Sequence, residues 1–245
     1  MNTEVIEVQS NLPANIDEMF RQDVAALQGR LLTPSGDRIK IENKRFILPS
    51  GAKLDFLDAV IVDFVYANRL YNKPYVKGVV TAPDCFATNP DAASLTPSAK
   101  SPNIQASNCA GCEKNQFGSA IQGAGKACQN RILIALLPGD AKQETPFMIL
   151  DISPTAIKGF SNYVNVVQNA LGRPPYGVFT KITCDPNKKE DVATFGDPQK
   201  INDAQFIMMV RGRQQEARTR LMVDPNVDNV SANESKLQPA RRRRA

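Results

Sequence analysis

The sequence predicts an α+β fold in which an antiparallel sheet carries an inserted cysteine-rich module. Short β-type runs fill residues 39–75 and return after residue 131. A strong helical pattern begins after Ser153-Pro154. Between the two β-rich regions, residues 82–130 lose periodicity and contain four of the five cysteines. A chain of 245 residues, 42% apolar and 22% charged, is long enough to bury a core.

Turns and helix caps set the expected boundaries. Pro49-Ser50-Gly51 predicts a turn, Ser153 an N-cap followed by proline at the first helical position, and Gly172 the end of that helix. The run 59–66 is the strongest strand pattern in the chain. The elements predicted in chain order are a helix at 11–29 with Asn15 as N-cap, strands at 39–41, 45–48, 59–66, 132–137 and 146–152, a helix at 154–171, a strand at 176–183 and a helix at 203–222.

Charge and composition divide the chain into three parts. Residues 1–37, an acidic helical segment, carry two basic residues against six acidic ones. Residues 38–222 form the expected β-rich domain, with the cysteine module at 82–130 inside it. Residues 223–245 have the composition of a disordered basic tail. The net charge of +5 comes from residues 211–245, which hold nine basic residues against four acidic ones.

The composition excludes several classes of site. Without histidine, the chain cannot supply a Ser-His-Asp triad, a Cys-His pair or a His-ligated metal. No paired carboxylates and no nucleophile with its base can be identified, so we expect a protein that is not an enzyme. No run approaches the roughly 18 apolar residues of a membrane span, and Glu4 and Glu7 stand where a signal peptide would be basic. We therefore expect a cytoplasmic protein without membrane contact.

Cysteine spacing is the most specific signal in the chain. Cys85, Cys109, Cys112 and Cys128 fall within 44 residues, and the two-residue gap between Cys109 and Cys112 lets both thiolates face one ion. We expect these four cysteines to bind a structural zinc ion, Zn²⁺, which would order a segment poor in apolar residues. An iron–sulfur cluster and unligated thiols remain alternatives. A disulfide framework and a thioredoxin-like redox pair are disfavoured by the odd cysteine count and the polar loop around Cys109.

A phosphate-binding loop is not supported between Cys112 and Cys128. The glycine-rich run there ends in Gly125-Lys126-Ala127, and Ala120 and Ala127 occupy the positions where the motif needs glycine and a hydroxyl. We expect these glycines to form turns instead.

Basic and aromatic residues alternate between positions 38 and 81. Aromatic faces stack bases and cations follow the backbone of single-stranded nucleic acid, and a five-stranded OB-type barrel supplies such a surface. The opposing interpretation assigns Phe46, Phe56 and Phe64 to the core and the lysines to a solvated face. The residues expected to contact nucleic acid are Lys44, Arg45, Lys53, Tyr66, Arg69, Tyr71, Lys73, Tyr75, Lys77, Lys126, Arg131 and the tail residues Arg241, Arg242, Arg243 and Arg244.

The cysteine block resembles a pattern in zinc-containing bacteriophage proteins. It comprises Pro83-Asp84-Cys85-Phe86-Ala87, Cys109-Ala110-Gly111-Cys112, Asn115, Phe117-Gly118-Ser119, Gly125-Lys126-Ala127-Cys128 and Arg131. Some of those proteins are OB-fold single-stranded-DNA-binding proteins, and others are recombination directionality factors. The resemblance covers roughly residues 45–185 and implies an OB-like sheet or barrel, the four cysteines as metal ligands, a role in phage replication or recombination, and a location in the host cytoplasm.

One departure concerns the C-terminus. Typical single-strand binders end in an acidic tail that recruits partners, whereas this chain ends in four arginines and Ala245. Such a tail would add phosphate contacts that do not depend on base sequence. We therefore expect a single-stranded-DNA-binding protein with replication or recombination proteins as further partners. The alternative is an adaptor, a directionality factor or transcription accessory, that docks on an integrase or a polymerase.

Overall fold

The computed structural model describes residues 37–72, 81–121 and 123–223, together with Met19. The described residues from Asp37 to Val223 belong to one compact unit, and the fold described below is that of this unit. The predicted helix at 11–29, apart from Met19, and the predicted tail at 224–245 lie outside the described residues.

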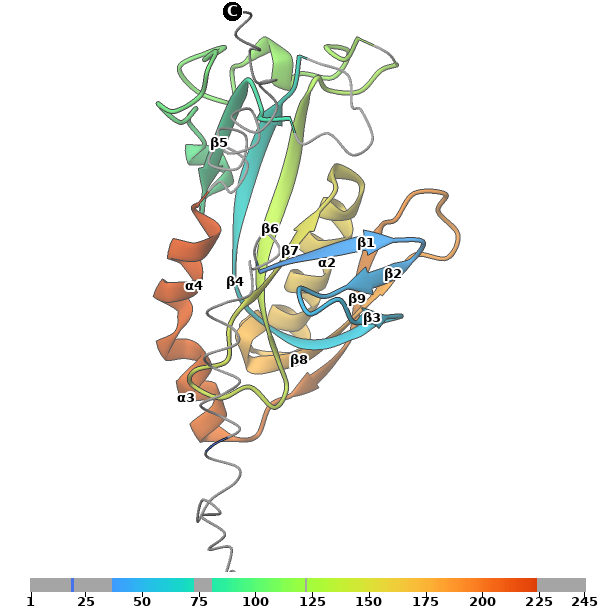
Figure 1. Ribbon diagram of the computed structural model, residues 1–245, viewed down its shortest axis with the longest axis vertical. Coiled ribbons are helices and arrows are strands. Elements are labelled where there is room, and N and C mark those ends of the chain that lie inside the picture. The colour runs from blue at the N-terminus through green and yellow to red at the C-terminus, as the bar shows by residue number, and fades with distance from the viewer. Residues whose placement is uncertain (1–18, 20–36, 73–80, 122, 224–245) are drawn as a thin grey trace, which may run out of the picture. The chain divides into compact units, whose positions relative to one another are not determined.

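A single nine-stranded sheet forms the centre of the described fold and curls into an open half-barrel (Figure 1). The strand order is β3-β2-β1-β7-β6-β4-β8-β9, and β5 pairs with β4. All neighbouring strands are antiparallel except β1 and β7, which are parallel. The strands are β1 (Arg38–Glu42), β2 (Arg45–Ile47), β3 (Lys53–Leu54), β4 (Leu57–Leu70), β5 (Cys85–Asn89), β6 (Cys128–Pro138), β7 (Met148–Ile152), β8 (Val178–Cys184) and β9 (Ala193–Lys200).

Strand β4 organises the sheet because it is long enough to serve three neighbours. One edge pairs with β6 along nearly the whole strand, while the other pairs first with β8 and then with β5. A register shift between Ile61 and Asp63 marks a bulge, after which the alternation of side chains changes face. Asp63 at the bulge accepts a hydrogen bond from Arg218 of helix α4 at 2.9 Å. Beyond the bulge, Tyr66, Asn68 and Leu70 share one face of the sheet.

Helices cover opposite faces of the sheet (Figure 1). Helix α2 (Pro154–Leu171) packs Phe160, Tyr163 and Val167 into the core on the face that also carries Tyr66 and Asn68. Helices α3 (Ala204–Gly212) and α4 (Gln214–Leu221) cover the other face, where Val210 and Leu221 are buried. We call these the α2 face and the α4 face.

Most of the predicted helices and strands are present in the structure, and two differ from the prediction. Helix α2 matches its prediction, with Ser153 as N-cap and Gly172 in the left-handed region at φ 63°. The single helix expected at 203–222 is wrong: it is interrupted at Arg213, whose buried guanidinium donates to the carbonyl oxygen of Thr145 at 2.7 Å. Strand β9 had no prediction, because Gly196 and Pro198 interrupt its sequence pattern.

The cysteine-rich segment lies at one end of β4 and β6, in the green loops of Figure 1. The expectation that residues 82–130 lack regular elements is wrong in part, because β5 lies within this segment and pairs with the C-terminal part of β4, from Tyr66 to Leu70. Two 3₁₀ turns, at Ala92–Ser94 and Glu113–Asn115, are the other regular elements described between β5 and β6. The segment is thus attached to the sheet through β5 and β6 and is otherwise made of loops.

Candidate functional site: a cysteine cavity beside an amide-lined pocket

The structure brings the four clustered cysteines to one place. Cys85 on β5 and Cys128 on β6 both pair with Leu70 of β4, from opposite sides, so their side chains share the α2 face. Cys109 and Cys112 come from the loop between these strands. All four line one cavity of about 20 Å³, which has room for a single water-sized particle. The fifth cysteine, Cys184, lies on β8.

Backbone and side-chain hydrogen bonds fix the loop that carries Cys109 and Cys112. The Cys109 amide donates to the carbonyl oxygen of Leu95 at 3.0 Å, and Asn115 Nδ2 donates to the carbonyl oxygen of Cys109 at 2.8 Å. The Asn115 amide donates to the carbonyl oxygen of Cys112 at 2.9 Å. Both cysteines are buried. The two thiols are therefore held on a loop with little freedom to move.

The thiols of the cavity lie close enough to influence each other's ionisation. Burial, followed by the charges of Cys109, Cys112 and Cys85, raises the pKa of Cys128 to about 12, against a smaller lowering by Lys126. Burial also raises the pKa of Cys109, which a hydrogen bond from Asn68 partly offsets. Four thiols with mutual repulsion in their ionised form are the donor set that a soft divalent cation stabilises.

The chemistry of these donors fits zinc, while a closed coordination shell is not formed. Among the residues that the structure describes, no three side chains of the His, Cys, Asp and Glu types are arranged to hold a metal ion. Zinc at the cysteine cavity therefore stays a prediction. It rests on the shared cavity and on the thiolate preference of the ion.

A larger pocket of about 280 Å³ adjoins the cysteine cavity on the α2 face. Asn68 of β4, Cys109 and Asn115 line both spaces. We call the larger space the amide pocket, because Asn68, Asn115 and Asn130 contribute to its wall. Its remaining lining residues are Tyr66, Ala92, Leu95, Ala110, Arg131 and Ile157.

The three asparagines and Lys126 form one hydrogen-bonded network. Asn130 Nδ2 donates to Oδ1 of Asn68 at 2.7 Å and to Oδ1 of Asn115 at 2.8 Å. Lys126 Nζ donates to Oδ1 of Asn130 at 3.0 Å and to Oδ1 of Asn115 at 3.3 Å. The network places a cationic side chain beside the pocket and fixes the orientation of the amides.

Tyr66 forms an aromatic side of the amide pocket. Its ring is half-buried and contacts Phe64 edge to face, with 6.0 Å between the ring centroids. It also packs against the small cluster of Ala87, Leu95 and Cys109. The ring is therefore supported from behind by apolar contacts and borders the pocket.

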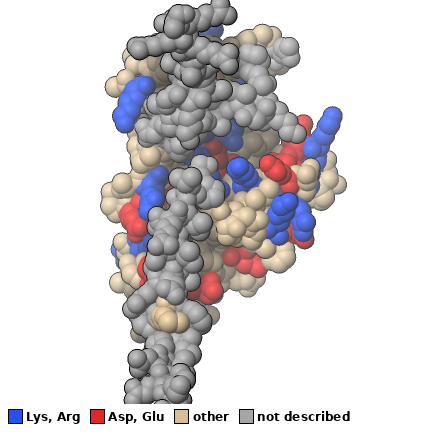
Figure 2. Space-filling model, in the orientation of Figure 1, with Lys and Arg blue, Asp and Glu red and all other residues tan. Residues whose placement is uncertain are grey.

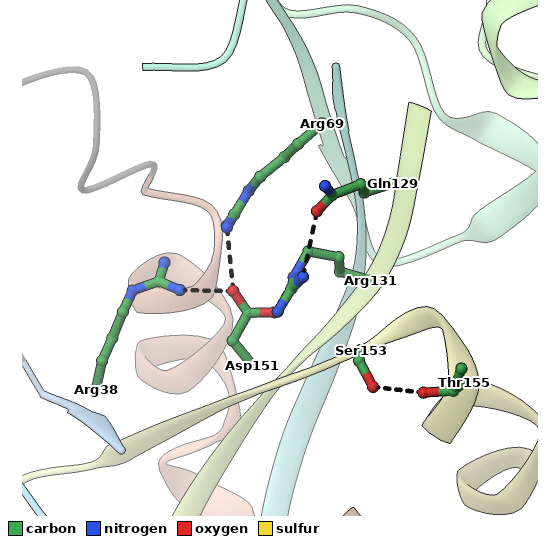
Figure 3. A network of polar contacts seen from close by, with 7 residues as sticks. All are labelled: Arg38, Arg69, Gln129, Arg131, Asp151, Ser153 and Thr155. Atoms are coloured by element: carbon green, nitrogen blue, oxygen red, sulfur yellow. Dashed lines mark hydrogen bonds and ion pairs between the residues drawn. The ribbon is translucent and has the colours of Figure 1, made fainter. Parts of the chain in front are cut away.

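Three arginines converge on a single carboxylate on the opposite, α4 face (Figure 3). Asp151 of β7 accepts from Arg131 Nε at 2.6 Å, from Arg69 at 3.0 Å and from Arg38 at 3.1 Å. These residues belong to β1, β4, β6 and β7, and the Asp151 side chain is 15% exposed. The cluster ties four strands together at the level where the cysteine segment begins.

The residues expected to bind nucleic acid do not share one surface. Tyr66 lines the amide pocket, and Lys126 is hydrogen-bonded to its wall. Arg131 borders the same pocket, but its guanidinium group binds Asp151 on the α4 face. Lys44 and Arg45 instead pair with Asp191 and Asp55 at the β2 end of the sheet. Lys53 is on the adjoining strand β3, Arg69 is 7% exposed within the Asp151 cluster, and Tyr71 follows β4. Lys73, Tyr75, Lys77 and Arg241 to Arg244 lie outside the described residues.

The charged side chains visible in Figure 2 are interspersed by sign over the described part of that face. No continuous basic groove over the described portion of 38–81 results, because several of its cations pair with carboxylates from separate parts of the chain, namely Asp55, Asp151 and Asp191. Two polar residues of the pocket, Asn68 and Asn130, are not predicted by the sequence patterns. Asn68 is a buried amide at the end of a strongly apolar strand, which is the signal that could have found it.

Comparisons of the chain with known protein families, with characterised proteins and with solved structures find no match. In the part of the chain that the structure describes, no helix combines the length and apolar character needed to cross a bilayer.

Proposed function

We propose that this protein binds single-stranded DNA without catalysing a reaction, and that a structural zinc ion stabilises its cysteine segment. The observation that carries the proposal is the meeting of Tyr66 and Lys126 at the amide pocket, where Tyr66 lines the space and Lys126 is hydrogen-bonded to two asparagines of its wall. These two residues are far apart in the sequence, and both were expected to contact nucleic acid. The curled, mainly antiparallel sheet supports an OB-like interpretation of the fold.

The pocket has the features that a nucleobase needs. Its volume of about 280 Å³ accommodates a planar heterocycle, and Tyr66 offers an aromatic side on which a base can stack. Asparagine amides at the wall provide donors and acceptors for base edges. Lys126 provides a positive charge near the position of the phosphate backbone. A single strand, with its bases unpaired, can insert a base there.

In this proposal the zinc ion has a structural role. Cys85, Cys109, Cys112 and Cys128 would hold it, and it supplies a tetrahedral cross-link between two strands and one loop. Because Cys109 and Asn115 line both the cavity and the pocket, the cross-link would fix one wall of the DNA site.

Fluorescence anisotropy with labelled oligo-dT over a salt series tests the proposal. We expect binding that weakens as salt rises, and Tyr66→Leu to weaken it by roughly 5- to 140-fold, the loss of one base-stacking contact. Tyr176→Leu is the matched control, because Tyr176 is also half-buried but packs on the α4 face. Absence of binding by the wild-type protein at low salt would refute the proposal.

A protein-interaction adaptor is the second candidate function. It is favoured by Ile121, an apolar side chain that is 92% exposed in the loop between Cys112 and Cys128. An adaptor would retain its partner, an integrase or polymerase subunit, after nuclease treatment. It would also lose that partner when Ile121 is replaced by serine.

A further inference from the structure

Phe117 stands on the surface of the cysteine segment with its ring in solvent. The side chain is 82% exposed, although it belongs to a well-bonded loop. Ser119 Oγ donates toward the carbonyl oxygens of Gln116, at 2.6 Å, and Lys114, at 2.9 Å, and accepts from the Ala127 amide at 3.0 Å. Because the backbone around it is fixed, the ring is held in water instead of folding back onto the protein.

Gly118 makes this position of the ring possible. It has φ 86°, a conformation that favours glycine, and its amide donates to the carbonyl oxygen of Gly125 at 2.9 Å. That bond, together with one from the Ala120 amide to the same carbonyl oxygen at 3.2 Å, closes the loop. The sharp turn directly after Phe117 therefore belongs to a built structure.

Lys126 connects the exposed ring to the amide pocket. Its Nζ lies 5.1 Å from the centroid of the Phe117 ring, within the range of a cation–π contact. The same ammonium group donates to Asn115 and Asn130 at the wall of the pocket. One face of the ring meets the cation and, at 82% exposure, the other face is open. A cation next to an open aromatic face is the arrangement by which proteins bind single strands.

We propose that Phe117 is a second base-stacking site, on which a base of the strand lies while Lys126 contacts the adjoining phosphate. The inference rests on the proposed function and extends it, since the strand would run from the amide pocket past Lys126 to the tip of the loop. A nucleobase fits this site better than an apolar protein surface does, because the charge of Lys126 complements a phosphate and opposes burial against apolar groups.

Oligo-dT binding by loop variants tests the inference. Phe117→Ala is expected to weaken binding of a dT oligonucleotide by roughly 5- to 140-fold, and Phe117→Trp to retain it. Ile121→Ala is the matched control, an equally exposed apolar residue of the same loop that is expected to leave affinity unchanged. Because both side chains are in solvent, we expect neither substitution to alter the thermal unfolding midpoint. An oligonucleotide carrying 5-iododeoxyuridine is expected to photocrosslink to Phe117.

The outcomes separate this inference from the proposed function. If wild-type protein binds oligo-dT and Phe117→Ala binds equally well, the second stacking site is refuted and the proposed function stands. If Ile121→Ala weakens binding as much as Phe117→Ala, the loop acts through general apolar contact, as a protein-docking surface would, and the inference is again refuted. If the wild-type protein does not bind, both fail.

Discussion

Asn68 hydrogen-bonds the Cys109 thiol from the end of β4, and this bond lowers the pKa of Cys109 against the raising effect of burial. The same side chain accepts from Asn130 Nδ2 at 2.7 Å. Asn68 is 4% exposed, so both bonds are shielded from water. A single buried amide thus joins the cysteine cavity to the wall of the amide pocket.

Replacing Asn68 is therefore expected to weaken metal binding. Asn68→Ala removes the bond that favours the Cys109 thiolate, and loss of an outer partner of this kind reduces metal affinity by about 10- to 100-fold. Competition with a chromogenic chelator measures the change. Asn187→Ala is the control, because Asn187 is exposed in the turn before β9. Equal zinc affinity in both variants would show that Asn68 does not support the metal.

Removal of the metal is expected to unfold the cysteine segment before the rest of the protein. Its apolar burial is small, with Pro83, Phe86, Ala87 and Leu95 the buried apolar residues described in it besides Cys109 and Cys112. A zinc ion contributes about 10 kcal/mol or more to ordering such a unit. A chelator combined with a thiol reagent should release one zinc per chain and raise hydrogen exchange in 85–121 while α2 stays protected.

Two cysteine variants complete that experiment. Cys112→Ser should abolish zinc binding, whereas Cys184→Ser should retain it, because Cys184 lies on β8 and does not line the cavity. Metal analysis that finds iron and sulfide, with visible absorbance, would replace zinc by a cluster. A metal-free protein with unchanged exchange on chelation would remove the metal site.

The sequence allowed the strands and helix α2 to be predicted because their signals are local. A run of β-branched and aromatic residues identified the central part of β4, and Ser153-Pro154 with Gly172 marked the two ends of α2. The cysteine spacing likewise predicted which four thiols would meet, and they share one cavity. What the local pattern could not predict is the pairing order of the sheet, since the parallel contact between β1 and β7 joins residues 111 positions apart.

The ion pairs that the basic residues form also depend on this long-range order of the strands. Arg69 and Arg131 look like surface cations in a linear pattern, but the sheet brings both to Asp151. Lys44 and Lys126, by contrast, belong to different parts of the sheet, because Lys44 lies between β1 and β2 near one edge and Lys126 directly precedes the central strand β6. A basic segment in sequence therefore became several separate ion pairs in space.

The free energy of unfolding is expected to fall in alkaline solution because of the environment of Tyr163. Its hydroxyl lies 2.7 Å from Thr180 Oγ1, both residues are buried, and burial raises the pKa of Tyr163. The folded pKa then exceeds the unfolded value of about 10, so the unfolding free energy is fully retained below that pH and is lost as pH rises through the folded value. Urea denaturation between pH 8 and 11 measures this loss.

Tyr163→Phe is expected to remove that alkaline loss. At neutral pH it should cost about 1 kcal/mol, because the Thr180 hydroxyl, 0% exposed, loses its partner. Tyr176→Phe is the control, with the wild-type response to pH. Identical alkaline profiles for Tyr163→Phe and the wild-type protein would assign the loss to another group.

Asp151 is expected to be the most sensitive charged position in the described fold. Removing its carboxylate leaves Arg38, Arg69 and Arg131 close together without the group that they share, and Arg69 is only 7% exposed. Breaking a buried pair by removing one partner costs about 3–5 kcal/mol, and the exposure of Asp151 at 15% places the expected loss for Asp151→Asn near the lower end.

Asp55→Asn is the matched control, because Asp55 pairs with one arginine, Arg45, and is 73% exposed. Exposed pairs contribute about 0–1 kcal/mol, so its unfolding free energy should stay close to that of the wild-type protein. Added salt should recover part of the loss in Asp151→Asn, since it screens repulsion among the three guanidinium groups. If urea denaturation gave both variants the same small loss, unaffected by salt, the arginine cluster would contribute little to holding β1, β4, β6 and β7 together.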